Sequence, residues 1–211
     1  MSYICNMKTI GIDLWGTLIK ANPKFKERKQ DLFEKYNIIN GQEVMDDIKS
    51  DLNKIIEYSG WQPEDELIIT LLSSRLSKER NIIENFINDY QKLSELYSPV
   101  LIQDVEWFLN SLKNNYELHI VSNTMFIKGK SLATILDNLG ILKLFKTASF
   151  SDQMGYSKPN YRIHPREFDY FIGDNPITDG VYATKTKAKF IQIHTNNKTF
   201  KDAYNIITTD F

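Results

Sequence analysis

Residue types that bind phosphate and metal ions follow several separate apolar segments of this 211-residue sequence. Asp13 follows residues 9–12, Ser122 follows residues 117–121, and Asp174 closely follows residues 170–172. Carboxylates bind divalent cations and act as nucleophiles, and a hydroxyl group donates hydrogen bonds to phosphoryl oxygens. Brought together, these residues would support chemistry on a phosphate group.

The segments that carry these residues have the pattern of short buried strands. We predict strands at residues 9–12, 117–121, 147–150, 170–172 and 189–193, each followed by a polar or glycine-containing turn. Helical spacing of apolar residues lies between them, and Asn175 and Pro176 open a further helix. Strands that alternate with helices predict an α/β fold with a Rossmann-like parallel sheet, which binds ligands at the carboxyl ends of its strands.

Residues 20–99 interrupt this alternation. Their apolar residues recur at helical spacing, as at Val44, Ile48 and Leu52, and the last run ends at Ser98 and Pro99. We therefore predict an α/β core domain formed by residues 1–19 and 100–211, with a helical domain of residues 20–99 inserted into it.

Composition and charge argue against several other classes of protein. With 42% hydrophobic and 25% charged residues, the chain has the composition of an ordinary globular protein. Its formal net charge of −1 does not favour binding to nucleic acid or to a membrane surface. The single cysteine, Cys5, fits a reducing compartment, and no long apolar run or signal peptide is evident, so we expect a cytoplasmic protein.

Four motifs, in order along the chain, resemble those of the haloacid dehalogenase (HAD) superfamily. They are Asp13-Leu14-Trp15-Gly16-Thr17-Leu18, the strand that ends in Ser122-Asn123, Gly155-Tyr156-Ser157-Lys158-Pro159, and Gly173-Asp174 with Asp179. The helical insertion stands where that superfamily places a helical cap of the C1 type. Because the ordered set spans residues 9–195, the resemblance is specific.

The resemblance implies roles for the motif residues. Asp13 would be the nucleophile that forms an aspartyl-phosphate, and Ser122 and Lys158 would act on the phosphoryl group. Mg²⁺ would be bound by Asp13, by Asp174 and by the main-chain oxygen of Trp15, with Asp179 holding a metal-bound water. The remaining candidates for contact with the substrate are Thr17, Asn123, Lys20 and Asn22.

One position departs from the pattern. Phosphatases of this superfamily usually carry a second aspartate two residues after the nucleophile, and this chain has Trp15, which cannot exchange protons near neutral pH. Three explanations stay open: an acid from elsewhere, such as the cap or His164, a leaving group that needs little help, or a reaction other than ordinary phosphomonoester hydrolysis.

The connection between Lys158 and Gly173 is short for a crossover between parallel strands. Residues 160–169 lack helical periodicity, so we predict an irregular loop with at most one turn. Such a loop leaves one face of the sheet less covered, where a partner subunit is one candidate to cover it.

These expectations together favour a Mg²⁺-dependent phosphatase. It would act on a small soluble phosphomonoester, of the sugar, polyol, amino-alcohol or hydroxy-acid type, as a monomer or homodimer with no nucleic-acid or membrane partner. A 2-haloacid dehalogenase and a catalytically impaired phosphate-binding protein are the alternatives. Against the dehalogenase stand Asp174 and Asp179, because a metal-free enzyme gains nothing from paired metal-binding acids.

Overall fold

The structure of the protein is a computed structural model that describes residues 7–194 and 198–210, so Cys5 lies outside the described residues. Its centre is a sheet of five parallel strands in the order β5-β4-β1-β6-β7. The strands are β1 (Lys8–Ile12), β4 (Tyr116–Ser122), β5 (Thr147–Phe150), β6 (Tyr170–Gly173) and β7 (Lys189–Gln192). The predicted α/β fold is therefore confirmed, and all five predicted strands are present within one or two residues.

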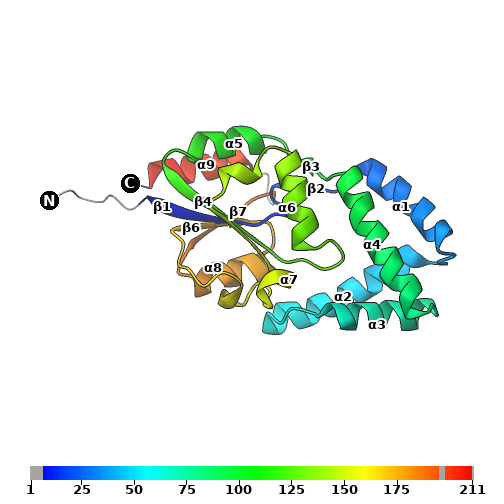
Figure 1. Cartoon of the computed structure of the whole chain (residues 1–211). Coiled ribbons are helices and arrows are strands. Elements are labelled where there is room, and N and C mark those ends of the chain that lie inside the picture. Colours follow the sequence, from blue (N-terminus) through cyan, green and yellow to red (C-terminus); the bar gives the residue numbers. More distant parts are fainter. Residues whose placement is uncertain (1–6, 195–197, 211) are drawn as a thin grey trace.

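Helices cover both faces of this sheet (Figure 1). On one face α5 (Val105–Leu112), α6 (Gly129–Asn138) and α9 (Phe200–Thr209) pack against Ile10, Ile12 and other buried aliphatic residues. On the other face lie a π-helical turn (Pro176–Gly180) and α8 (Val181–Lys185). The predicted helix start at Asn175 is confirmed, because the Asn175 side chain accepts hydrogen bonds from the main-chain N–H groups of Ile177 and Thr178. The helix α9 was not predicted from the sequence.

The crossover from β5 to β6 is irregular, as predicted. It contains α7 (Ser151–Met154), which we did not predict, and a single 3₁₀ turn (Tyr161–Ile163). Ile163 and Phe168 from this segment are buried against Phe171 of the sheet, next to Tyr182. These side chains cover the face that a crossover helix would otherwise cover.

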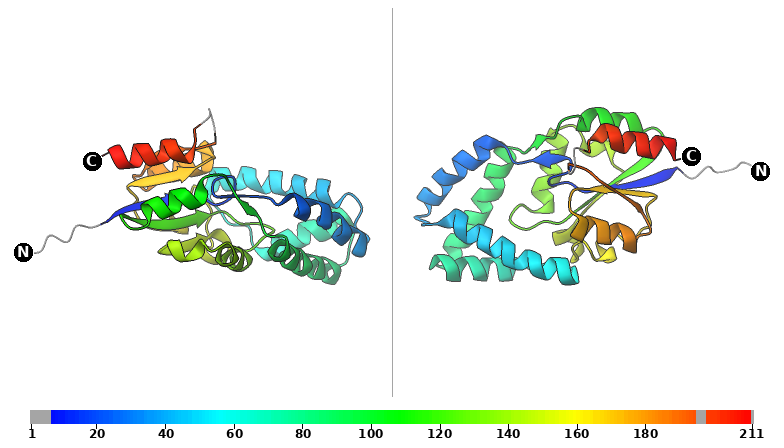
Figure 2. Two further views of the ribbon diagram at one scale, coloured as in Figure 1. Left: turned by 90° about the horizontal axis from the view of Figure 1, so that it is seen from above. Right: turned by 180° about the vertical axis from the view of Figure 1, so that it is seen from behind.

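Residues 23–96 form four helices beside the sheet, which we call the helical lobe (Figure 2). They are α1 (Pro23–Lys35), α2 (Gly41–Ser59), α3 (Asp65–Leu76) and α4 (Arg80–Leu96), and they bury a hydrophobic cluster of their own around Phe33, Leu72 and Phe86. The chain leaves for the lobe and returns from it through two short antiparallel strands, β2 (Ile19–Lys20) and β3 (Val100–Leu101). The domain boundaries predicted from the sequence, between residues 19 and 20 and between residues 99 and 100, lie within β2 and directly before β3.

The remaining short element is a 3₁₀ turn (Leu142–Leu144) after α6. Gly140, with a φ of 73°, follows α6 in the left-handed region, a conformation that commonly ends a helix. Within residues 7–194 and 198–210, no helix has both the length and the apolar composition needed to cross a membrane.

Candidate active site

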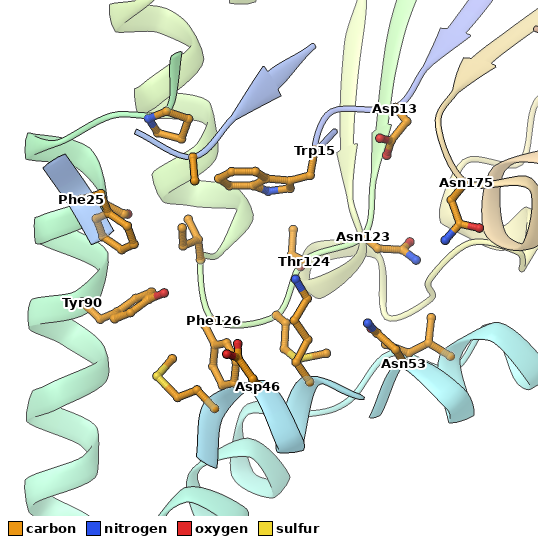
Figure 3. Close-up of a pocket in the computed structure, with 18 of the residues that line it drawn as sticks. Asp13, Trp15, Phe25, Asp46, Asn53, Tyr90, Asn123, Thr124, Phe126 and Asn175 are labelled. Carbon is orange, nitrogen blue, oxygen red and sulfur yellow. The ribbon is translucent and has the colours of Figure 1, made fainter. Parts of the chain in front are cut away.

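The carboxyl ends of the central strands bring the predicted chemical residues together. Asp13 follows β1, Ser122 ends β4, and Asp174 follows β6, and β1 lies between β4 and β6 in the sheet. Lys158 comes from the loop that follows α7. In Figure 3 Asp13, Asn123 and Asn175 face a common cavity that the helical lobe covers on the far side.

An aspartate triad with one lysine forms the centre of the site. Asp13, Asp174 and Asp179 each present a carboxylate oxygen, and these oxygens lie within 4.8 Å of one another. Lys158 Nζ lies 2.5 Å from Asp13 Oδ1 and 2.7 Å from Asp179 Oδ1, and its side chain is 1% exposed. Three carboxylates therefore share one buried ammonium group, which leaves the cluster with excess negative charge.

Burial shapes the pKa values of this cluster. Burial raises the pKa of Asp13 to about 7, Lys158 acts in the opposite direction, and the charges of Asp179 and Asp174 raise it further. Burial, and then the charge of Asp179, also raises the pKa of Asp174. Burial alone would lower the pKa of Lys158, but the two contacting carboxylates outweigh it and the net shift is upward. Lys158 is thus held as a cation, while Asp13 is unfavourable as an anion until further positive charge arrives.

The residues present fit a hard divalent cation such as Mg²⁺. Asp179 Oδ1 is fully buried and accepts no hydrogen bond with proper geometry from any described residue, even with Lys158 Nζ at 2.7 Å. The main-chain oxygen of Trp15 likewise accepts no hydrogen bond from the described residues, because the turn pairs Gly16 N and Ile19 N with other acceptors. Free oxygen ligands beside three carboxylates are what such a cation requires.

Two glycines make room for these carboxylates. A Cβ atom at Gly173 would lie 2.2 Å from Asp179 Oδ2, and one at Gly16 would lie 2.6 Å from Asp174 Oδ2. Gly16 also has a φ of 78°, which side chains rarely adopt. Any larger residue at either position would displace a carboxylate of the triad.

The structure places the other motif residues around this centre. Asn123 brackets the backbone of Lys158, accepting a hydrogen bond from its N–H at 2.7 Å and donating one to its carbonyl at 3.0 Å. Thr17 is buried and its hydroxyl lies 3.4 Å from Asp174 Oδ1, as a donor. The buried Ser122 hydroxyl donates to the main-chain oxygen of Asn123 at 3.2 Å. Ser122, Asn123 and Thr17 therefore lie next to the triad or its lysine.

The two candidates nearest the lobe are placed differently from each other. Asn22 lines the cavity, but its side chain caps α1 by accepting from Lys24 N and donates to the Ser98 carbonyl. Lys20 is exposed on β2 and is not among the residues that line the cavity. Asn22 thus joins the two ends of the lobe, and the structure does not bring Lys20 into the cavity.

His164 is also outside the cavity. It hydrogen-bonds Ser149 at 2.8 Å and stacks on Phe168, beside His119, on the face of the sheet that the irregular crossover covers. The acidic side chains that line the cavity apart from the triad are Asp46 and Glu57, both on α2. An acid that replaces the usual aspartate at Trp15 would therefore come from the lobe.

A contact between the lobe and the lysine loop was not predicted from the sequence. After α2, Gly60 accepts a hydrogen bond from Ser157 N at 2.9 Å, and Gln62 accepts one from the Ser157 hydroxyl at 2.6 Å. Gln62 and Ser157 are both buried, and Gln62 also donates to the carbonyl of Thr124. Because Ser157 directly precedes Lys158, the lobe and the lysine are linked by hydrogen bonds. No local sequence signal pairs residues 62 and 157, which are 95 positions apart.

The cavity has a volume of about 650 Å³ and extends from the triad to the lobe. Aromatic side chains line part of it, namely Trp15, Phe25, Tyr90, Tyr97 and Phe126. Residues of α2 line another part, with polar side chains such as Asp46 and Asn53 directed toward the cavity (Figure 3). The space beyond the triad is therefore large and partly aromatic.

Comparison with known proteins gives a consistent picture. The family model of haloacid dehalogenase-like hydrolases matches residues 10–193, whereas no curated protein matches the chain. YfnB from Bacillus subtilis, in a structure bound to magnesium that reveals interdomain movement, is 18% identical with a TM-score of 0.74. That alignment covers 96% of this chain and 99% of YfnB.

Two further solved structures are similar over nearly their whole length. A protein described as a predicted phosphoglycolate phosphatase from Haemophilus somnus 129PT is 18% identical, with a TM-score of 0.63 and coverage of 95% of this chain and 98% of its own. A HAD phosphatase from Thermococcus onnurineus is 18% identical, with a TM-score of 0.60, and the alignment covers 95% of this chain and 98% of that protein. At these identities the likeness establishes a shared fold.

Proposed function

Because this chain belongs to the haloacid dehalogenase-like hydrolase family, we propose that it is a Mg²⁺-dependent phosphatase that hydrolyses a small phosphomonoester. The observation that supports this most is the position of Lys158 between Asp13, at the carboxyl end of β1, and Asp179, in the π-helical turn after β6. A buried cation beside a buried carboxylate suits attack on an anionic group. In this proposal residues 20–99 are a cap on a core of residues 1–19 and 100–211.

The proposed reaction has two steps. A carboxylate oxygen of Asp13 attacks phosphorus, the ester P–O bond breaks, and the departing alkoxide takes a proton to become the alcohol. Water then attacks the phosphorus of the aspartyl-phosphate, so that inorganic phosphate leaves and the Asp13 carboxylate is restored. Lys158 offsets the repulsion between the nucleophile and the phosphate in both steps.

Mg²⁺ would be held by Asp13, Asp174 and the main-chain oxygen of Trp15, with Asp179 bound to one of its waters. When bound, it supplies positive charge that offsets the carboxylates and the phosphate. The magnesium in the YfnB structure supports this assignment. In the same proposal, the Ser122 hydroxyl turns to the phosphoryl group, Asn123 holds the lysine loop, and Thr17 and Asn22 stand beside the substrate.

The test is phosphate release from a panel of phosphorylated metabolites, with Mg²⁺ and with EDTA. We expect Mg²⁺-dependent release, and we expect Asp13→Asn to reduce kcat by several orders of magnitude while the far-ultraviolet circular dichroism stays unchanged. Acid quenching during turnover of a ³²P-labelled substrate should trap label on the wild-type protein and none on Asp13→Asn.

Two results would replace this function with one of the alternatives. Metal-independent release of chloride from a 2-chloroacid, abolished by Asp13→Asn, would indicate a dehalogenase. Binding of vanadate without turnover of any compound in the panel would indicate a phosphate-binding protein that lacks catalysis. An Asp13→Asn variant with more than about a tenth of the wild-type rate would exclude the covalent mechanism.

A further inference from the structure

The cavity beyond the triad is larger than a short-chain phosphate requires. Its volume of about 650 Å³ lies in the range of about 300–1000 Å³ that holds drug-sized ligands. A substrate of two or three carbons would leave most of this space to water. The side chains that line the cavity therefore indicate the chemical class of the alcohol part of the substrate.

One wall is aromatic. The rings of Phe25 and Tyr90 meet edge to face with their centroids 5.2 Å apart, and the ring centroids of Tyr90 and Phe126 are 6.5 Å apart. Trp15 stands on the core side of the same space, only two residues after the nucleophile, with its indole directed into the cavity (Figure 3). A ring joined to a phosphate on Asp13 would therefore reach the indole. Planar rings gain from stacking on such side chains.

The opposite wall is polar. Gln42, Asp46, Lys49, Asn53 and Glu57 recur along α2 at helical spacing and line the cavity, together with the apolar Met45 and Ile56. Ile48 and Leu52, on the other side of the helix, are buried in the lobe. This wall offers both donors and acceptors, and both signs of charge. It therefore suits the polar edge of a ring.

Two donors near the aromatic wall have no partner. The Tyr90 hydroxyl and the Trp15 indole N–H make no hydrogen bond to any residue in the described part of the chain, and both residues line the cavity. A ligand with hydrogen-bond acceptors on a flat ring would satisfy them, whereas an aliphatic chain would not.

We propose that the preferred substrate is a phosphomonoester whose alcohol part carries a planar heteroaromatic ring, and that this ring lies between Trp15 and the polar face of α2. The inference rests on the proposed phosphatase function and adds a substrate class to it. It concerns the leaving-group side of the cavity, so it is separable from the chemistry at Asp13.

The test compares compounds with and without a ring. Uridine 5′-monophosphate, adenosine 5′-monophosphate and pyridoxine 5′-phosphate form one set, and ribose 5-phosphate, glycerol 3-phosphate and phosphoglycolate form the other. We expect the best compound of the first set to exceed every compound of the second by about 10- to 100-fold in kcat/KM, the range expected for stacking of one ring on an aromatic side chain. A ring-free compound that equals or exceeds it would overturn the inference.

Variants then locate the effect. Trp15→Leu should lower kcat/KM for the best ring compound about 10-fold more than it lowers kcat/KM for ribose 5-phosphate, mostly through KM. Trp15→Phe, which keeps an aromatic face, should recover most of the loss. The control is Trp107→Leu, since Trp107 lies on α5 against Tyr204, away from the cavity, and should change neither substrate.

The two proposals fail in different ways. Equal losses for ring-bearing and ring-free compounds in Trp15→Leu would mean that Trp15 supports the site as a whole, and the ring assignment would be wrong. No turnover of any compound by the wild-type protein would contradict the phosphatase function instead. Turnover confined to the ring-free set would retain that function and reject this inference alone.

Discussion

Gly173 gives the sharpest test of how closely the metal site is packed. A methyl group at this position would lie 2.2 Å from Asp179 Oδ2 and 2.5 Å from its Cγ, and ordinary contact begins at 3.4 Å. The carboxylate would therefore have to move by about 1.2 Å. It has little room to do so, because it is 1% exposed and is held by Asn175 N at 3.1 Å and by Lys158.

We expect Gly173→Ala to weaken Mg²⁺ binding without removing any ligand. Disturbing a residue that holds a metal-bound water typically costs about 10- to 100-fold in metal affinity or activity, so the Mg²⁺ concentration for half-maximal activity should rise by that factor. The same overpacking should lower the free energy of unfolding by roughly 1–3 kcal/mol in EDTA. The two effects share one cause, the displaced carboxylate.

The assay is phosphate release titrated with Mg²⁺, together with urea unfolding in EDTA. Gly180→Ala is the matched control: it makes the same change one residue after Asp179, at an ordinary helical φ of −65°, and its methyl group meets the edge of Phe190 at 3.2 Å instead of a carboxylate. We expect the control to keep the wild-type Mg²⁺ requirement. If Gly173→Ala keeps it too, the position of Asp179 does not set metal affinity and the reasoning is refuted.

Three further predictions address the triad, the lobe contact and the buried histidine. Asp174→Asn should abolish the rise in melting temperature that Mg²⁺ gives the wild type. It should not lower stability in EDTA, because the raised pKa of Asp174 indicates that its charge is unfavourable without a cation. Equal Mg²⁺ stabilisation of both proteins would remove Asp174 from the metal site. Gln62→Ala, which removes the acceptor for the Ser157 hydroxyl, should lower both kcat, by about 10-fold, and stability. The control is Gln30→Ala at an exposed position, which should change neither. Lower stability at an unchanged kcat would show that the contact between Gln62 and Ser157 is structural only. Burial lowers the pKa of His119 to about 4 from 6.5, so its stabilising contribution is complete above pH 6.5 and is lost as the pH falls toward 4. The difference in unfolding free energy between the wild type and His119→Gln should therefore shrink by about 2 kcal/mol between pH 7 and pH 5, and a constant difference would contradict it.

Local patterns predicted the residues at the strand ends. Asp13, Ser122 and Asp174 follow short apolar strands, and parallel strands bring their carboxyl ends to one edge of the sheet. The position of Lys158 came from the resemblance, since a lysine in a loop carries no signal of burial. Its contacts with two carboxylates depend on the path of the irregular crossover, which no periodicity describes.

Long-range contacts account for most of what the sequence did not predict. β2 and β3 have two residues each, too few for a periodic pattern, and they pair across the whole lobe. The lobe contact of Gln62 with Ser157 is equally remote in sequence. The suggestion that His164 lies near the site rested on its closeness to Lys158 along the chain, but the crossover turns it to the other face of the sheet, beside His119.

Trp15 and Gln62 together connect the chemistry of the core to the lobe. Trp15 occupies the position where the resemblance noted in the sequence predicts a second aspartate, and the acids that line the rest of the cavity, Asp46 and Glu57, belong to α2. Gln62, just after the end of that helix, contacts the residue before Lys158. A lobe that moved away from the core would therefore remove the candidate acids from the substrate and the hydrogen bond from the lysine loop in one motion. If the protein is a phosphatase as proposed, we therefore expect turnover to depend on the lobe in its docked position.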